Sequence, residues 1–198
     1  KLKKYNNLMF VDDDIYLKKK INYDFFNYLN SYPAVSGFTD KIPKTQTSID
    51  VTENLWNFYR NLILRKKIKP KNKLIRDSLN YSNDKILYKF YWSHGSFELF
   101  NVRLLEKNNL TGFLDEFNRY GGVYKHRWNN GYILDLFLRT YFNKPIYNLN
   151  LIKKGFVEPK IQGAESFIYW GYRDSYNSSL FRLLIIFKNL IKKVFFIK

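Results

Sequence analysis

Hydrophobic positions along this chain recur with two different periods, which predict a mixture of helices and strands. Apolar residues at helical spacing predict three longer helices, at residues 51–64, 108–120 and 131–142, the second of which ends at Gly121 and Gly122. Short apolar runs predict strands at residues 8–15, 35–38, 86–92 and 97–100. An aromatic-rich helix is expected at residues 22–30, and the stretch 31–48, with two prolines and a glycine, is expected to be mostly loop. This order of elements indicates an α/β fold.

The segment 178–198 has a pattern of its own. On a helical wheel, apolar residues such as Leu183 and Phe187 fall on one side and cations such as Lys192 on the other. The segment carries too many cations to span a bilayer, and a basic amphipathic helix of this kind can lie on a membrane surface. Docking of the same helix against the core is the alternative. We therefore expect a main domain at residues 1–177 and a basic amphipathic helix at residues 178–198.

Composition supports a folded domain. The chain has 198 residues, among them 17 Tyr, 18 Phe and 4 Trp. Disordered chains are poor in aromatic residues, so a sizeable core is expected. The absence of cysteine excludes disulfides, thiolate zinc sites and cysteine nucleophiles. Because the first residue is Lys1 and an apolar run follows almost at once, we expect the chain to be a piece of a longer protein.

The chain is strongly basic, with 34 Lys and Arg against 17 Asp and Glu and a net charge of +17. Such an excess fits nucleic acid, an anionic membrane surface or an anionic substrate. No helix-turn-helix, zinc-finger or aromatic RNA-binding signature is present, and no specific nucleic-acid partner is predicted. The basic run 65–73 is interpreted as a solvated linker in preference to a binding patch. Charge alone therefore leaves a basic nucleic-acid-binding protein as an alternative function.

The acidic triplet Asp12, Asp13 and Asp14 follows the first apolar run directly. Unpaired carboxylates are costly to bury, so the triplet is expected at the exposed end of a buried strand. Side chains at i and i+2 of an extended backbone point to the same side, so Asp12 and Asp14 are candidate ligands for one hard cation, Mn²⁺ or Mg²⁺. Such a cation can hold the pyrophosphate of a nucleotide-sugar. A turn or a helix N-cap is the alternative interpretation of the triplet.

Several sequence blocks between residues 8 and 142 carry a resemblance to a known family. These blocks are residues 10–15 (FVDDDI), 21–26 (INYDFF), 37–39 (GFT), 92–99 (WSHGSFEL), 113–115 (FLD) and 121–128 (GGVYKHRW). In this order they resemble the fungal α-1,2-mannosyltransferases of the Golgi, the Kre/Mnt/Ktr-type enzymes. The first two blocks are similar to the family's acidic-Pro-Asp-Val and Asp-Tyr-Asp-Val-Phe segments, and the last to its Gly-Gly-Phe-Tyr-Tyr-Glu-Arg-Trp segment.

The resemblance implies a GT-A-like, Rossmann-type α/β sandwich, of which residues 1–177 would form the C-terminal part. It implies a metal-dependent, retaining transfer of mannose from GDP-mannose to a glycan or glycoprotein acceptor, with Mn²⁺ bound by Asp12. Glu98 corresponds to the family's Phe-Glu glutamate, a proposed nucleophile or stabiliser of the oxocarbenium ion. The expected location is the Golgi or another endomembrane in a eukaryote, and otherwise the cytoplasmic membrane surface.

The same resemblance assigns donor or acceptor binding to His126, Arg127, Trp128 and Asp14. An Arg can grip a phosphate with two parallel hydrogen bonds, and a Trp face can stack on a sugar. The alternative for Arg127 and Trp128 is an Arg stacked on a core Trp.

The chain also departs from the family. The segment 127–130 (RWNN) lacks the family's Gly-Asp, His126 replaces a glutamate, and the family's late metal-binding His has no clear match. A catalytically inactive, glycan-binding relative is therefore a further alternative.

Overall fold

The computed structural model describes residues 5–11, 15–17, 20, 24–42, 46–93, 97–151, 154 and 157–159. The predicted metal ligands Asp12 and Asp14 lie outside the described residues, as does the predicted helix at 178–198. Within the described part of the chain, no helix is both long and apolar enough to cross a membrane.

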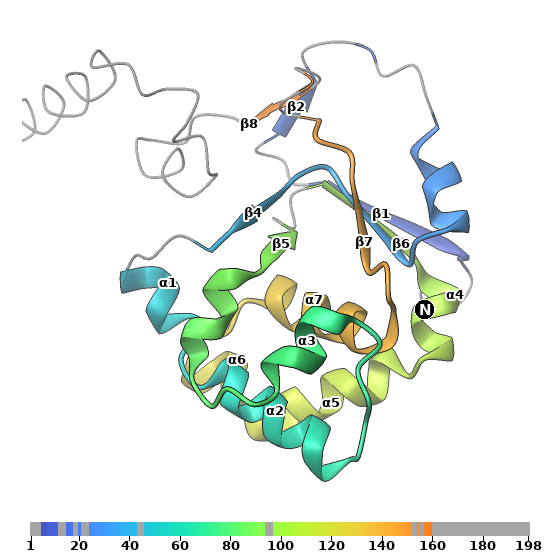
Figure 1. Ribbon diagram of the computed structural model, residues 1–198. Helices are drawn as coiled ribbons and strands as arrows, with labels where there is room; N and C mark the ends of the chain where they lie inside the picture. Colours follow the sequence, from blue (N-terminus) through green and yellow to red (C-terminus); the bar gives the residue numbers. More distant parts are fainter. Residues whose placement is uncertain are drawn as a thin grey trace, which may run out of the picture. The chain divides into compact units, whose positions relative to one another are not determined.

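A four-stranded sheet in the order β1-β6-β3-β7 organises the described part of the chain (Figure 1). Its strands are β1 (Asn7–Val11), β6 (Phe97–Asn101), β3 (Ala34–Ser36) and β7 (Ile146–Asn148). The β1–β6 and β6–β3 pairs are antiparallel, whereas β3 and β7 run parallel. Two smaller antiparallel sheets pair β4 (Thr39–Lys41) with β5 (Tyr91–Ser93), and β2 (Ile15–Leu17) with β8 (Val157–Pro159). The predicted α/β fold is thus present as a mixed sheet with one parallel pair.

Helices gather on one side of this sheet in Figure 1. They are α1 (Gln46–Asp50), α2 (Leu55–Arg65), α3 (Lys73–Ser78), α4 (Val102–Lys107), α5 (Leu110–Tyr120), α6 (Gly122–Lys125) and α7 (Asn130–Tyr141). Two 3₁₀ helices, η2 (Phe25–Asn30) and η3 (Asp84–Lys89), complete the described elements. Helix α5 ends as predicted, because Gly121 adopts a left-handed conformation with φ of 74° and its N–H bonds back to the carbonyl of Phe117.

The central strand β6 separates two clusters of buried side chains, since alternate residues of a strand point to opposite faces. Phe97 and Leu99 pack with Leu29 and Val35 on the face that η2 covers. Phe100 belongs instead to the larger cluster, which includes the buried aromatic and aliphatic residues of α2, α5 and α7. Glu98 alternates in the same way as Phe100, so its side chain lies on the helix-covered face.

Two predicted strands differ from the structure. The run 8–15 is not a buried strand: β1 ends at Val11 and is an edge strand, with Met9, Phe10 and Val11 each more than 40% exposed. The run 86–92 is mostly the 3₁₀ helix η3, because Asn83 caps its start by accepting the N–H of Lys85, and only its end enters β5. In both places the apolar pattern alone did not distinguish a central strand from an edge strand or a buried turn of helix.

The predicted helix boundaries lie closer to the observed ones than the predicted strands do. The helix expected at 51–64 is α2, which begins at Leu55, and the helix expected at 22–30 is the 3₁₀ helix η2, which begins at Phe25. The loop expected at 31–48 also contains β3 and β4. The run 65–73 is largely exposed, and the N–H groups of Lys71 and Asn72 donate to the last carbonyls of α7.

Candidate functional site

Glu98 occupies the central strand of the main sheet and is only 8% exposed. In the strand register it lies opposite Phe10 of β1 on one side and Ser36 of β3 on the other. A carboxyl group in the middle of a sheet needs polar partners, because an unpaired buried charge is strongly destabilising. The partner that the described contacts give it is the hydroxyl group of Ser93 on β5.

A chain of oxygen atoms leads away from Glu98. Ser93, at the end of β5, contacts Glu98 Oε1 with its hydroxyl group, and the same hydroxyl lies 2.8 Å from the hydroxyl of Ser36. Ser36 in turn donates to the carbonyl of Phe38 at 2.6 Å. Ser36 and Ser93 are both buried. Glu98 is therefore held by a hydroxyl chain that is shielded from water.

Helix α7 adds two charged side chains beneath β5. Asp135 Oδ2 accepts the backbone N–H of Ser93 at 2.9 Å, and Arg139 donates to the backbone carbonyl of Tyr91. Because these residues are one helical turn apart, α7 presents an acceptor and a donor to one edge of β5. The guanidinium of Arg139 also lies over the rings of Phe90 and Trp92, at 5.8 and 5.7 Å from their centroids.

The electrostatics of Asp135 reflect this buried position. Burial raises the pKa of Asp135 to about 7, Arg139 opposes the rise, and the nearby charge of Glu98 adds to it. A carboxyl group that titrates near neutral pH beside a second buried carboxyl group is unusual for a purely structural residue, and such pairs are concentrated at functional sites.

The described part of β1 leads to this site. Val11, the last residue of β1, pairs with Phe97, next to Glu98. Asp12 and Asp14 follow in the sequence but lie outside the described residues, as does His94 between β5 and β6. Among the residues that the structure does describe, no group of three or more His, Asp or Glu side chains is placed to hold a metal.

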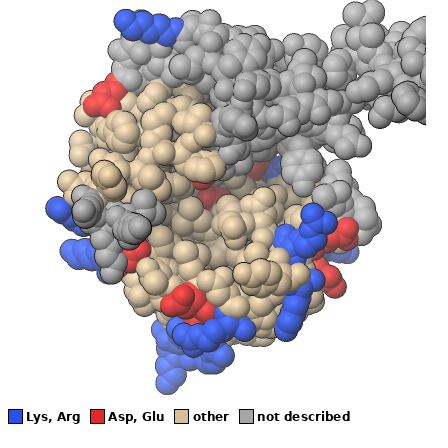
Figure 2. Space-filling model, turned by 180° about the vertical axis from the view of Figure 1, so that it is seen from behind, with Lys and Arg blue, Asp and Glu red and all other residues tan. Residues whose placement is uncertain are grey.

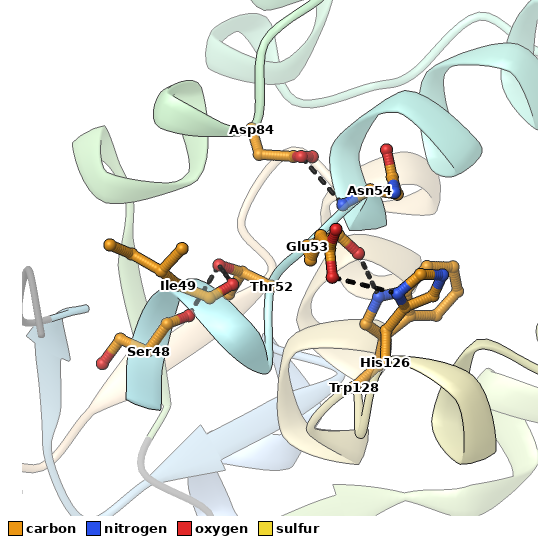
Figure 3. Close-up of polar contacts among 8 residues, drawn as sticks. All are labelled: Ser48, Ile49, Thr52, Glu53, Asn54, Asp84, His126 and Trp128. Carbon is orange, nitrogen blue, oxygen red and sulfur yellow. Dashed lines mark hydrogen bonds and ion pairs between the residues drawn. The ribbon is translucent and has the colours of Figure 1, made fainter. Parts of the chain in front are cut away.

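The other predicted site residues belong to a different set of contacts, between the start of α2 and the segment after α6 (Figure 3). His126 Nδ1 lies 3.3 Å from Glu53 Oε2, and Trp128 Nε1 donates to the backbone carbonyl of Glu53 at 2.6 Å. The rings of Tyr120, His126 and Trp128 are stacked. None of the hydrogen bonds described for His126 or Trp128 involves Glu98, so the structure joins them to α2 and not to the Glu98 network.

The structure corrects the role predicted for Trp128. Its side chain is 2% exposed and packs against Phe58, Phe117 and Gly122, so it has no free face on which a sugar could stack. This agrees with the alternative interpretation of a core Trp. Arg127 is exposed and has a left-handed backbone with φ of 53°, which turns the chain between the two aromatic residues. Arg127 therefore remains available to a ligand, whereas Trp128 supports the core.

Sequence reasoning missed Ser36, Ser93, Asp135 and Arg139. A signal for the last two was present: both fall within the predicted helix 131–142, in a run rich in apolar residues, and residues 135–140 are all buried in the structure. Charged residues on the buried face of an amphipathic helix require partners. The serines carried no such signal, because their neighbourhood depends on the pairing of β3 with β6.

An apolar groove of about 660 Å³ is lined by other residues, and neither Glu98 nor Asp135 is among them. Its lining includes Leu8 of β1, Phe100 of β6, and Asn130, Ile133 and Leu134 from the start of α7. Figure 2 shows a hollowed middle on one face of the molecule with acidic side chains within it, while many of the Lys and Arg side chains gather toward the bottom and right.

Comparison with known proteins gives a structural likeness to a solved structure. No protein-family model matches the chain, and no curated protein matches it. Among solved structures, the chain is similar to the mannosyltransferase Ktr4p from S. cerevisiae, determined by X-ray crystallography in complex with GDP, with a TM-score of 0.58 and 18% sequence identity. The likeness covers 79% of this chain and 40% of that chain, so this chain spans less than half of its neighbour's length. The described fold is therefore a mixed α/β fold similar to that of a glycosyltransferase.

Proposed function

We propose that this chain is part of a retaining glycosyltransferase that transfers mannose from GDP-mannose to a glycan or glycoprotein acceptor. The observation that carries the proposal is Glu98, a buried and hydrogen-bonded carboxyl group at the centre of a fold shared with a GDP-bound mannosyltransferase. Buried carboxyl groups with dedicated partners are rarely retained for packing alone. The donor, the retaining outcome and the GT-A subclass belong to the proposal.

In this proposal Glu98 acts on the sugar face opposite the leaving phosphate. Retaining transfer requires a group there, which either attacks the anomeric carbon or stabilises the positive charge that develops on it. The hydroxyl of Ser93 fixes the position of the Glu98 carboxyl group, so little reorganisation is needed when that charge develops. Because Glu98 and Ser93 are both buried, water is largely excluded and the electrostatic interaction is stronger.

The donor's phosphates need positive charge as well. Asp12 and Asp14 are the proposed ligands of Mn²⁺ or Mg²⁺, and such an ion, when bound, would neutralise the pyrophosphate of the leaving nucleotide. The exposed Arg127 is the proposed phosphate contact from the protein, because its guanidinium presents a fork of donors. His126 is 20% exposed and paired with Glu53. In this proposal it orients the segment and does not bind the donor's phosphates.

A thermal-shift screen of nucleotide-sugars, with and without MnCl₂, tests the proposal on the full chain. We expect GDP-mannose to raise the melting temperature only when Mn²⁺ is present, because binding to the native state stabilises it. Asp12→Ala should abolish the Mn²⁺-dependent shift without lowering the melting temperature of the free protein. Asp77→Asn, at an exposed position on α3, is the matched control and should keep the shift. A screen in which no nucleotide-sugar gives a Mn²⁺-dependent shift would contradict the proposal.

Two other functions give different results. A basic nucleic-acid-binding protein would bind RNA or DNA with an affinity that falls steeply as salt rises, because bound phosphates release counterions. A catalytically inactive relative would bind the donor or the glycan without releasing GDP. A membrane-bound form, through the proposed helix at 178–198, would also bind anionic vesicles at low salt.

A further inference from the structure

Strand β1 forms an open edge of the main sheet within the described part of the chain (Figure 1). It pairs with β6 on one side, and no described strand pairs with it on the other. Met9, Phe10 and Val11 are all exposed, and because alternate residues point to opposite faces, apolar surface is exposed on both faces of the strand. An exposed apolar edge strand is a template for pairing with another chain.

The edge lacks the features that usually prevent such pairing. Proteins protect an edge strand with charged residues, proline or a bulge. The sequence of β1, NLMFV, contains no charged residue and no proline, and its pairing with β6 runs through all five residues without a bulge. Lysine is absent from this strand although Lys and Arg make up 34 of the 198 residues. The edge therefore has the composition of a contact surface.

The hydrogen bonds of β1 show which of its backbone groups face the open edge. The N–H of Val102 donates to the carbonyl of Asn6 at 2.9 Å, which continues the β1–β6 register by one residue. In an antiparallel pair, residues whose backbone groups point at the partner strand alternate with residues whose groups point away from it. Because the groups of Asn6 point at β6, those of Asn7, Met9 and Val11 point to the open edge.

These outward backbone groups are self-complementary about Met9. When a second copy of β1 runs antiparallel to the first with Met9 opposite its own counterpart, Asn7 comes opposite Val11 of the second copy. Each pair then exchanges backbone hydrogen bonds, because it joins residues whose groups face the open edge. A register shifted by one residue would place outward groups opposite inward ones and lose these bonds.

The side chains match in the same register. Leu8 and Phe10 lie on the helix-covered face of the sheet, opposite Phe100 and Glu98, and each comes opposite the other between the two copies. Phe10 is exposed, and Leu8 lines the apolar groove. Phe10 of one copy would therefore pack beside Leu8 of the other at this groove, as an aromatic–aliphatic cross-strand pair.

The charges that flank β1 in the sequence, outside the described residues, have the matching order. Lysines occupy three of the four positions before Tyr5, and Asp12, Asp13 and Asp14 follow Val11 directly. Antiparallel pairing brings the beginning of one strand toward the end of the other. It therefore favours attraction between the lysines of each copy and the aspartates of its partner, whereas parallel pairing would bring like charges together. This order of charges favours a second copy over an unrelated apolar strand.

We propose that two copies of this chain associate through β1, antiparallel and centred on Met9, so that their main sheets join into one continuous sheet. The interface is isologous, because both copies contribute the same five residues. It covers the exposed Met9 and Phe10 and gives partners to the outward backbone groups. The inference goes beyond the proposed function, and the five residues of β1 are separate from those assigned to the donor and the sugar.

Sedimentation equilibrium of the full chain at several concentrations measures this association. We expect the average mass to rise with concentration from that of one chain to that of two. Met9→Lys places two like charges opposite each other at the two-fold axis, so this variant should remain a single chain at the same concentrations. Leu64→Lys is the matched control, because Leu64 is an apolar residue of α2 that is 49% exposed, and it should associate like the wild type.

Three results of this experiment would overturn the inference. A wild-type chain that remains monomeric would leave the edge to a strand from another protein. A mass that continues to rise beyond two chains would show an open-ended contact in place of an isologous one. Equal association of Met9→Lys and the wild type would place the contact away from Met9.

A mixture of two charge variants tests the register. Met9→Asp should also be monomeric by itself, because two carboxylates then meet at the axis. An equal mixture of Met9→Asp and Met9→Lys should form heterodimers, since opposite charges now lie opposite each other. Far-UV circular dichroism should show both variants folded, because Met9 is exposed. Folded variants that remain monomeric when mixed would contradict the register centred on Met9.

Cross-linking gives a readout that needs no charged substitution. Because the chain has no cysteine, Met9→Cys and Tyr124→Cys each introduce a single thiol. A short bifunctional thiol reagent should join Met9→Cys chains into covalent dimers. It should join few Tyr124→Cys chains, although Tyr124 on α6 is 85% exposed. Equal yields at the two positions would indicate random collision and overturn the pairing through β1.

Discussion

The indole Nε1 of Trp128 donates a 2.6 Å hydrogen bond to the backbone carbonyl of Glu53, which stands 75 positions earlier in the sequence. The bond joins the segment after α6 to the turn before α2, where Asn54 has a left-handed backbone (Figure 3). Among the described backbone hydrogen bonds outside the regular elements, none donates to this carbonyl. Trp128 therefore supplies both packing and the missing donor.

Trp128→Phe tests this relationship. The change removes the donor and part of the buried volume, so it should lower the free energy of unfolding by about 2–4 kcal/mol. Chemical denaturation, followed by tryptophan fluorescence or by far-UV circular dichroism, measures the loss of stability. Tyr124→Phe is the control, because Tyr124 lies nearby on α6 and is 85% exposed. Equal stability of Trp128→Phe and wild type would show that the hydrogen bond and the packing are not needed.

Gly122 is expected to tolerate no side chain. A Cβ atom at Gly122 would lie 2.1 Å from Trp128 Cζ3, which is closer than any real contact. Gly122→Ala should therefore destabilise the protein by about 1–3 kcal/mol through overpacking. Gly131→Ala, near the start of α7, serves as the comparison, because there a Cβ meets only the tip of the Asn129 side chain at 3.0 Å. Thermal unfolding that ranks the two variants in the opposite order would contradict the packing described here.

Asp84 caps α2 from outside the helix. Its two carboxylate oxygens accept the N–H groups of Asn54 and Trp56, each at 2.8 Å, where the helix has no side-chain cap of its own. Asp84→Asn keeps one acceptor oxygen and removes the charge, so it should cost about 1–2 kcal/mol of stability. Asp77→Asn, at an exposed position on α3, should cost almost nothing. Matching denaturation midpoints for the two variants would disprove the capping role.

The raised pKa of Asp135 predicts how stability depends on pH. Its pKa is about 7 in the native protein and about 3.9 in an unfolded chain. Between these values the native state binds a proton that the unfolded state has lost, so this group's contribution to stability falls as pH rises from about 4 to about 7. The slope is at most about 1.4 kcal/mol per pH unit.

Denaturation of the wild type and of Asp135→Asn at several pH values measures this slope. The difference between the two proteins should fall across the same window. Glu116 works in the opposite sense at lower pH, because its hydrogen bond with Lys66 lowers its pKa, and this effect cancels in the difference. A difference that does not change between pH 4 and 7 would contradict a raised pKa for Asp135.

The sequence predicted those features that depend on local chemistry. The stop of α5 at Gly121 follows from one residue's freedom to adopt a left-handed backbone, and α7 follows from apolar spacing. Glu98 was singled out by the resemblance. The strand that carries it, β6, was predicted from the short apolar run at residues 97–100. Such features are visible within a window of about ten residues.

The remainder required the tertiary structure. Whether the run at β1 forms an edge or a central strand depends on which strands lie beside it, and those lie about 90 residues away. The same is true of Trp128, whose burial follows from contacts with α2 and α5 and not from its neighbours in the sequence. Asp135 and Ser93 meet only because α7 packs under β5, so no local pattern could reveal their hydrogen bond.

The rate of GDP release from GDP-mannose by Glu98→Gln, compared with the wild type and with Glu106→Gln, tests the central claim most directly. Gln keeps the shape of Glu98 and removes the charge, whereas Glu106 lies in α4, where its carboxylate accepts an exposed hydrogen bond from the hydroxyl of Thr111. We predict that Glu98→Gln lowers turnover by about 10³-fold or more with nearly unchanged donor affinity, because the charge acts mainly in the transition state. Glu106→Gln should retain wild-type turnover. Near-normal turnover in Glu98→Gln would contradict both a nucleophilic and an electrostatic role for Glu98.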